Sequence, residues 1–254
     1  MGTSEVTTKA HKASIPLKME RNIPFSAPQT PSNVIVVGCG GTGSHIIPHL
    51  IRLIASKPNK ASIKITFVDG DVVESKNLIR QHFIESDISK NKAEVLAARY
   101  SAAFGIPIAF KDKYIENHIE FSNLLESAVT SPIIISCVDN VKTRHMIKTA
   151  VDCAAGNVLW IDCGNEDMAG QVVLSSHIPT WSVSSIEKTR RFPMPDVFEL
   201  YPDLYTKLAN DKFASELSCA EMAVSSPQHG FVNLTAATLA LNFIYGIFSN
   251  QPIY

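Results

Sequence analysis

The chain has 254 residues, 45% of them hydrophobic, and a formal net charge of −1. This composition can fill the core of one large domain, and the near-neutral charge excludes bulk attraction to nucleic acid or to an anionic membrane. The five cysteines include no C-x-x-C pair, which argues against a disulfide framework and against a structural zinc site.

The two ends of the chain differ from its middle. Residues 1–30 are polar and rich in Lys, Thr and Pro, so we expect a tail or a loosely packed arm there, and no signal peptide. The apolar stretch at 232–248 is interrupted by polar residues, so a buried helix explains it better than a membrane span. We expect a cytoplasmic protein with no membrane partner.

From residue 33 onward, strand patterns alternate with helix patterns. Strands are predicted at 33–37, 62–68, 106–111, 132–137, 157–162 and 170–174, and helices at 43–56, 90–104, 117–128, 140–155 and 228–249. Such alternation indicates an α/β fold: a Rossmann-like, mostly parallel sheet flanked by helices, with a C-terminal helix. Residues 177–217 show no clear period and predict a long irregular crossover segment. Pro48 is expected to kink or shorten the first helix.

A glycine motif follows the first strand directly. The sequence from Val34 to Ser44 reads VIVVGCGGTGS, which contains the spacing G-x-G-x-x-G. Glycine lets the backbone turn tightly and approach a phosphate closely, and the helix that follows presents free N–H groups to an anion. The motif predicts a nucleotide site but does not separate a redox cofactor from ATP.

The segment after the second strand carries the discriminating residues. Asp69 ends that strand, where an acid can bind ribose hydroxyls in either class of enzyme. Asn77, Arg80 and Gln81 fall in one short turn, and Lys92 follows on the next helix. Hydride transfer has no use for such donors beside the phosphates, whereas a reaction that builds negative charge on phosphorus needs them.

A further acid, Asp139, follows the fourth strand, at the edge where open α/β sheets bind ligands. A carboxylate beside several phosphates is repelled unless a cation lies between them. We therefore assign Asp139 to Mg²⁺, directly or through water.

Taken together, these motifs resemble the ThiF/MoeB family, relatives of the ubiquitin-activating enzymes. The motifs are G-x-G-G-x-G-S, D-x-D-x-V-x-x-x-N-L-x-R-Q, a Lys and C-x-D-N-x-x-x-R, in that order. The likeness runs from about residue 33 to 175 and resumes around 218–248, and it is strongest to the ThiF-type proteins of PRTRC systems.

The resemblance implies an adenylation domain at 31–254 in which ATP adenylates the C-terminal carboxylate of a ubiquitin-like or sulfur-carrier protein. It also implies a homodimer and a possible conjugating enzyme as partner. By this resemblance the nucleotide would be lined by Gly38, Gly40, Gly41 and Gly43. Asp69 would hold the ribose, with Asp71 nearby. The phosphates would be contacted by Asn77, Arg80 and Lys92, and Mg²⁺ would be held by Asp139. Gln81 and Arg144 sit at matching positions without a defined role.

Cys219 resembles the cysteine of thiol-using members, and a thiolate there would hold the activated tail as a thioester. The chain departs from many members in lacking C-x-x-C pairs, so we expect no zinc, and in lacking an N-terminal arginine motif, for which Arg21 is a weak substitute. Cys137, Cys153 and Cys163 lie in apolar contexts that predict core packing.

Two other functions stay open at this point. A NAD-dependent oxidoreductase would share the glycine motif and Asp69 but leaves Asn77, Arg80, Lys92 and Asp139 unexplained. A non-catalytic scaffold half of a heterodimeric activating enzyme usually loses part of the phosphate-binding set, which looks complete here. His45 and His49 have the i, i+4 spacing of zinc ligands, but the sequence offers no third ligand.

Overall fold

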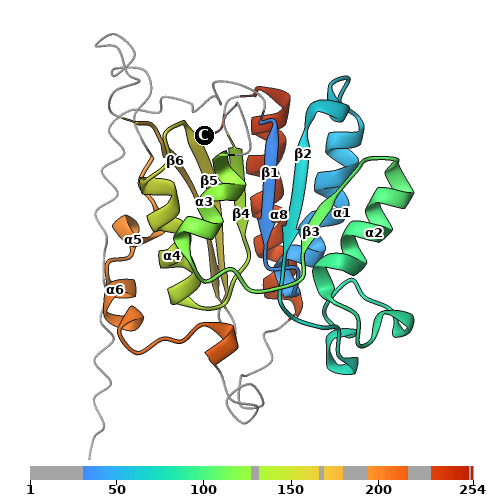
Figure 1. Cartoon of the computed structure of the whole chain (residues 1–254), viewed down its shortest axis with the longest axis horizontal. Coiled ribbons are helices and arrows are strands. Elements are labelled where there is room, and N and C mark those ends of the chain that lie inside the picture. Colours follow the sequence, from blue (N-terminus) through green and yellow to red (C-terminus); the bar gives the residue numbers. More distant parts are fainter. Residues whose placement is uncertain are drawn as a thin grey trace, which may run out of the picture.

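A computed structural model of the chain describes residues 31–126, 132–165, 169–179, 194–216, 230–251 and 253. At its centre is a six-stranded sheet with the order β3-β2-β1-β4-β5-β6 (Figure 1). The strands are β1 (Asn33–Val37), β2 (Lys64–Val68), β3 (Ala109–Lys111), β4 (Pro132–Ser136), β5 (Val158–Asn165) and β6 (Gly170–His177). Neighbours from β3 to β5 pair in parallel, and β6 pairs with β5 antiparallel. The predicted fold class is confirmed.

Helices cover both faces of the sheet (Figure 1). One face carries α1 (Gly41–Ala55), α2 (Lys92–Phe104) and α8 (Gly230–Ser249), and the other carries α3 (His118–Glu126) and α4 (Val141–Asp152). Two short helices, α5 (Val197–Leu200) and α6 (Asp203–Leu208), lie beside α4. Within the described ranges, 3-10 turns lie at Lys60–Ser62, Ser75–Asn77, Glu85–Asp87 and Ala214–Glu216.

The first strand shows how the sequence divides the core into two layers. All five residues of β1 are buried, and successive side chains of a strand point to opposite faces. Val34 and Val36 therefore join the cluster under α1, α2 and α8, while Ile35 and Val37 join the cluster under α3 and α4. A strand buried on both sides reads as a continuous apolar run, as the sequence indicated.

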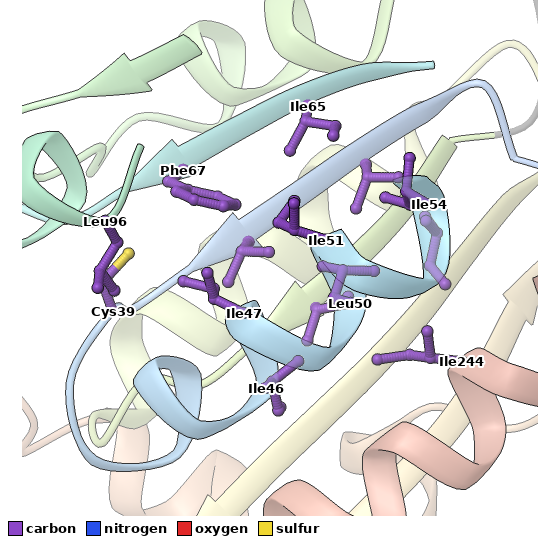
Figure 2. Close-up of a cluster of buried hydrophobic side chains, with 14 of the residues drawn as sticks. Cys39, Ile46, Ile47, Leu50, Ile51, Ile54, Ile65, Phe67, Leu96 and Ile244 are labelled. Atoms are coloured by element: carbon purple, nitrogen blue, oxygen red, sulfur yellow. The ribbon is translucent and has the colours of Figure 1, made fainter. Parts of the chain in front are cut away.

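Apolar residues of α1 make up much of the first cluster. Figure 2 shows isoleucines and Leu50 of α1 between Ile65 and Phe67 of β2 and Ile244 of α8. Pro48 lies inside α1 and is buried, and the helix continues to Ala55. A proline removes one backbone hydrogen bond, but the apolar contacts on either side hold the helix together past that residue.

The last helix is a core element of this sheet. By length and composition alone α8 could cross a membrane. It packs along α1 and beside β5 and β6, with Ala236, Ala240, Ile244 and Ile247 buried. The interpretation of this stretch as a buried helix is consistent with that packing.

Two local features differ from a simple reading of the sequence. The described residues 194–216, which carry no visible period, form α5, α6 and a 3-10 turn. The prediction that Cys153 packs in the core is wrong: it follows the last turn of α4 and is exposed, whereas Cys163 is buried and Cys137 is half-buried.

The order of the strands creates a switch point between β1 and β4. The chain runs outward from β1 through β2 to β3 and then returns to β4 on the opposite side of β1. The loops after β1 and β4 therefore diverge, and open α/β sheets bind their ligands in the crevice that forms there. The predicted site residues follow β1, β2 and β4 at this edge.

Candidate active site

The glycine loop after β1 is packed too tightly for side chains at two positions. Gly38 has a φ of +87°, and a Cβ there would lie 2.6 Å from the carbonyl oxygen of Cys137. A Cβ on Gly43 would lie 2.0 Å from the carbonyl oxygen of Gly38. These two glycines let α1 start directly above the ends of β1 and β4.

The start of α1 leaves donors for an anion. Gly40 is the N-cap residue, and within the described residues no side chain caps the helix. The first amides of a helix have no intrahelical acceptor and carry the positive end of its dipole. The first turn of α1 can therefore bind a negatively charged group such as a phosphate.

Asp69 ties the end of β2 to this loop. Its two carboxylate oxygens accept hydrogen bonds from the backbone N–H groups of Cys39, at 2.6 Å, and Asp71, at 2.8 Å. Burial raises the pKa of Asp69 from 3.8 to about 6, although the nearby Lys92 ammonium acts to lower that pKa. The carboxylate is thus fixed beside the glycine loop, where the ribose of a nucleotide is expected.

Lys92 and Asp71 form a charged pair next to Asp69. The Nζ atom of Lys92 lies 2.6 Å from Oδ2 of Asp71, and the lysine side chain is 7% exposed. Burial disfavours the ammonium, but Asp69 and Asp71 outweigh burial and raise the pKa of Lys92. Burial likewise acts to raise the pKa of Asp71, but Lys92 and Tyr114 lower it overall. The group is one cation shared by two carboxylates.

Two residues that the sequence analysis missed complete this group. The Tyr114 hydroxyl donates a hydrogen bond to Asp71, and burial together with that bond raises the pKa of the phenol. Asn91 donates from Nδ2 to the carbonyl oxygens of Asp69, at 2.8 Å, and Asp71, at 3.1 Å, while its Oδ1 caps α2. An Asn directly before a helix is a recognisable cap in the sequence, but nothing local indicates its bonds to the β2 loop.

The turn that follows carries the other predicted donors. Asn77 is buried, and its Oδ1 accepts a hydrogen bond from the N–H of Glu74 at 2.9 Å. The carbonyl of Asn77 accepts from the backbone N–H groups of Arg80 and Gln81. Gln81 is buried against the glycine loop, since a Cβ on Gly40 would lie 3.7 Å from its Nε2 atom. Arg80 is half-buried and lies in the same turn, directly before Gln81.

The loop after β4 presents Asp139. This residue is exposed, and its charge contributes to the raised pKa of Tyr114, which places it on the same edge as Asp71. The described residues contain no group of three His, Cys, Asp or Glu side chains that could hold a metal. A cation at Asp139 would therefore complete its coordination with a ligand and water, as Mg²⁺ commonly does.

Arg144 points away from this edge into the core. Its guanidinium pairs with Asp162 at 3.2 Å and donates to the carbonyl oxygens of Val138, at 2.5 Å, and Cys163, at 3.3 Å. Arg144 therefore fixes the backbone just before Asp139, and its role in this structure is to position that loop.

A buried polar network supports the glycine loop from below. Asn165 at the end of β5 donates from Nδ2 to Thr42 of α1 and, at 2.9 Å, to Oδ1 of Asn233 in α8. Asn233 is fully buried, and a Cβ on Gly41 would lie 2.4 Å from its Nδ2 atom. In the sequence Asn233 is one of the polar residues that interrupt the apolar stretch at 232–248, and a lone Asn in a buried helix is the available signal of this support.

The predicted site residues thus converge on one edge of the sheet, with two exceptions. Arg144 faces the core, and Cys219 lies outside the described residues. Cys39 lies in the loop as a buried thiol whose pKa is raised well above its usual value by burial and by Asp69, so it remains protonated.

Comparison with known proteins places the chain in a family. The family model described as the ThiF family matches residues 30–253. The chain is 31% identical over 117 residues to the SAMP-activating enzyme E1 of Haloferax volcanii. The aligned region covers 46% of this chain and 40% of that protein. It is 32% identical over 148 residues to the adenylyltransferase and sulfurtransferase MOCS3-2 of Zea mays, with 58% of this chain and 28% of that protein covered. The chain therefore spans less than half the length of these relatives.

Two solved structures share the fold. PaaA superposes with a TM-score of 0.56 at 16% identity, over 88% of this chain and 58% of that chain. E. coli MccB, crystallised with AMPCPP and MccA, superposes with a TM-score of 0.54 at 22% identity, over 87% and 57% of the two chains. The match to the family model extends over nearly all of the sequence, and the chain belongs to the ThiF family.

Proposed function

We propose that this protein is an ATP-dependent adenylyltransferase that activates the C-terminal carboxylate of a ubiquitin-like or sulfur-carrier protein. The observation that carries the proposal is the convergence of Asp69, Lys92 and the Asn77–Gln81 turn on the glycine loop at one sheet edge. The names of two relatives, a SAMP-activating enzyme and an adenylyltransferase and sulfurtransferase, describe activities of the same kind. The narrower resemblance to PRTRC proteins stays a prediction.

The reaction would be a displacement at the α-phosphorus of ATP. An oxygen of the carrier's carboxylate forms a bond to that phosphorus, and the bond to the bridging oxygen breaks. Pyrophosphate leaves with the electron pair, and an acyl-adenylate remains. The amides of α1 bind phosphate, Asp69 accepts the ribose hydroxyls, and Arg80 and Lys92 stabilise the charge that develops on phosphorus.

The donor set at Asp139 fits Mg²⁺. This cation prefers carboxylate oxygens and is usually held by one or two acids together with substrate phosphates and water. Asp139 supplies one exposed carboxylate at the right edge. The bound ion would offset the repulsion between the triphosphate and the acids of the site.

Later steps and partners are part of the same proposal. The thiol of Cys219 would attack the acyl-adenylate, release AMP and hold the carrier as a thioester. The protein would act in the cytoplasm as a homodimer, and a conjugating enzyme or a sulfur donor would receive the activated tail. A non-reducing gel of wild-type and Cys219→Ser protein, after incubation with carrier, tests the thioester: a wild-type band that thiols remove and that the variant lacks is expected.

The decisive measurement is ATP–pyrophosphate exchange with candidate carriers that end in Gly-Gly. Exchange should require ATP, Mg²⁺ and carrier together. Asp139→Asn should lower exchange by about a hundredfold or more, while the exposed Asp203→Asn on α6 serves as the matched control and keeps wild-type exchange. A protein that binds a nicotinamide cofactor and ignores ATP would contradict the proposal and favour the oxidoreductase.

A further inference from the structure

Tyr114 lies in the group of charged side chains at the end of β2 and takes no part in the proposed chemistry. It follows β3, which pairs with β2, and the backbone N–H of Asp69 donates to the carbonyl oxygen of Lys111, the last residue of β3, at 3.1 Å. Ile115, the next residue, is buried in the cluster under α3 and α4. The loop after β3 is therefore fixed beside the end of β2, and Tyr114 is half-buried there.

The ring of Tyr114 packs directly on Gly70, which stands between Asp69 and Asp71 in the sequence. A Cβ on Gly70 would lie 2.7 Å from Cγ and Cδ2 of the ring and 2.8 Å from Cδ1. These atoms belong to the rigid part of the side chain nearest the backbone, so a side chain at residue 70 would displace the whole ring. The absence of a side chain at Gly70 is what gives the tyrosine ring its place.

The hydroxyl of Tyr114 determines how the Asp71 carboxylate is oriented. It donates to Oδ1 of Asp71, while Oδ2 of the same carboxylate lies 2.6 Å from Nζ of Lys92. A carboxylate that is held at one oxygen can still rotate about its Cβ–Cγ bond, whereas one held at both oxygens keeps a fixed plane. The donor at Oδ1 therefore fixes the direction in which Oδ2 meets the ammonium.

The position of the Lys92 ammonium depends on that carboxylate. Within the described residues, Asp71 accepts the one hydrogen bond that Nζ donates. Asp69 attracts the ammonium through its charge, but such attraction has little directional preference, and the four-carbon side chain of lysine is flexible. The hydrogen bond to Asp71 thus sets the place of Nζ beside the glycine loop.

We propose that Tyr114 is a positioning residue that acts through Asp71 on Lys92. Its hydroxyl fixes the carboxylate, and the carboxylate fixes the ammonium. This inference rests on the proposed function, because that function makes Lys92 a cation that stabilises the charge developing on phosphorus. Without the hydroxyl the carboxylate turns and Nζ moves with it. A displacement of about 1 Å in such a group can lower a reaction rate by on the order of a hundredfold.

The first experiment observes Lys92 by NMR in the full chain without nucleotide. Lysine carrying ¹³C at its ε carbon is incorporated, and Lys92→Met identifies the signal of Lys92. In wild type this signal should lie apart from those of exposed lysines, because the ammonium is buried and held in one position. Tyr114→Phe keeps the ring on Gly70 and removes the hydroxyl, so the signal should move toward the exposed lysines. Tyr245→Phe removes an exposed hydroxyl on α8 and should leave the signal unchanged.

A second variant displaces the ring without removing a donor or an acceptor. Gly70→Ala must push the ring of Tyr114 away, so the Lys92 signal should move in the same direction as in Tyr114→Phe. Gly156→Ala, where a Cβ meets nothing within 4 Å, is the matched control. A Lys92 signal that stays in place in either Tyr114→Phe or Gly70→Ala would overturn the inference.

The kinetics of ATP–pyrophosphate exchange test the catalytic consequence. Tyr114→Phe should lower kcat by about tenfold and change KM for ATP by less than about twofold, because Lys92 acts mainly on charge that develops in the transition state. In the Lys92→Met background the same substitution should leave the residual exchange within about twofold, since the tyrosine acts through the lysine. A tenfold loss in that background as well would show that Tyr114 acts by another route.

The two measurements separate this inference from the proposed function. A Lys92 signal that depends on Tyr114, in a protein that shows no exchange with any carrier, would contradict the proposed function and keep the link from Tyr114 to Lys92. Wild-type exchange kinetics in Tyr114→Phe, despite a changed Lys92 signal, would overturn the inference and keep the proposed function.

Discussion

Gly43 packs directly on the carbonyl oxygen of Gly38, so close that a Cβ at residue 43 would lie 2.0 Å from that atom. Gly43→Ala must therefore push α1 off the ends of β1 and β4, which should lower the free energy of unfolding by about 2–3 kcal/mol and abolish nucleotide binding. Urea titration measures the first effect and calorimetry the second. Gly156→Ala is the matched control, since nothing lies within 4 Å of a Cβ there. Equal stability of the two variants would contradict this packing argument.

Removal of Lys92 should leave two neighbouring acids without their shared cation. Lys92→Met is expected to lower the free energy of unfolding by about 3 kcal/mol at pH 7, the lower end for a broken buried pair, because Asp71 is 45% exposed. The exposed Lys76–Glu74 pair offers the control, and Lys76→Met should cost less than about 1 kcal/mol. A similar loss in both variants would show that burial of the pair is not what matters.

The raised pKa of Asp69 predicts a pH-dependent stability of definite sign. The folded chain binds a proton at about pH 6 and the unfolded chain near 3.8, so the folded state holds more protons between these values. Stability from this group is therefore largest below pH 3.8 and is lost as the pH rises through 6.

The comparison with Asp69→Asn isolates that contribution. Asn keeps one acceptor and cannot ionise, so the stability of the variant relative to wild type should rise by on the order of 2 kcal/mol between pH 4 and 7. The lost second hydrogen bond adds a constant penalty, and ATP affinity should fall at every pH. Urea unfolding at five pH values measures the difference, and a flat difference would mean that the two states bind protons equally.

Asn233 should matter for the glycine loop although it lies on the last helix. Asn233→Leu removes the acceptor for Asn165 and Thr42, so we expect a loss of about 1–2 kcal/mol and weaker nucleotide binding. Asn242→Leu on the exposed side of the same helix should change stability by less than about 0.5 kcal/mol. Thermal unfolding with and without ATP distinguishes a local effect on the loop from a general effect on α8.

Local patterns in the sequence were sufficient to predict the positions of most strands of the sheet. The apolar run before Gly38 has the same bounds, 33–37, in the prediction and in the structure. The ends of α2 and α8 match their predicted positions, 104 and 249. The two ends of α1, the two ends of α4 and the start of α2 shifted by one to three residues, because caps and final turns depend on single hydrogen bonds such as that of Asn91. Strand β5 extends to Asn165, three residues beyond its predicted end, because it pairs with β6 along its whole length.

The site was predictable where one motif carries the residues and not where distant segments meet. The glycines, Asp69 and the Asn77–Gln81 turn are short-range patterns. Tyr114, Asn91 and Asn233 join residues from separate elements. Arg144 lies within a motif, yet its direction is decided by Asp162 on the neighbouring strand. Those partners depend on the packed fold and leave no local signal.

The packing of α8 against α1 has a consequence for synthesis on the ribosome. The glycine loop and α1 emerge before α8, and Asn233 and Ile244, which complete their surroundings, are made almost two hundred residues later. A nascent chain that ends before residue 230 leaves one side of α1 bare to solvent and to chaperones. Assembly of the nucleotide loop must therefore wait until α8 has been synthesised.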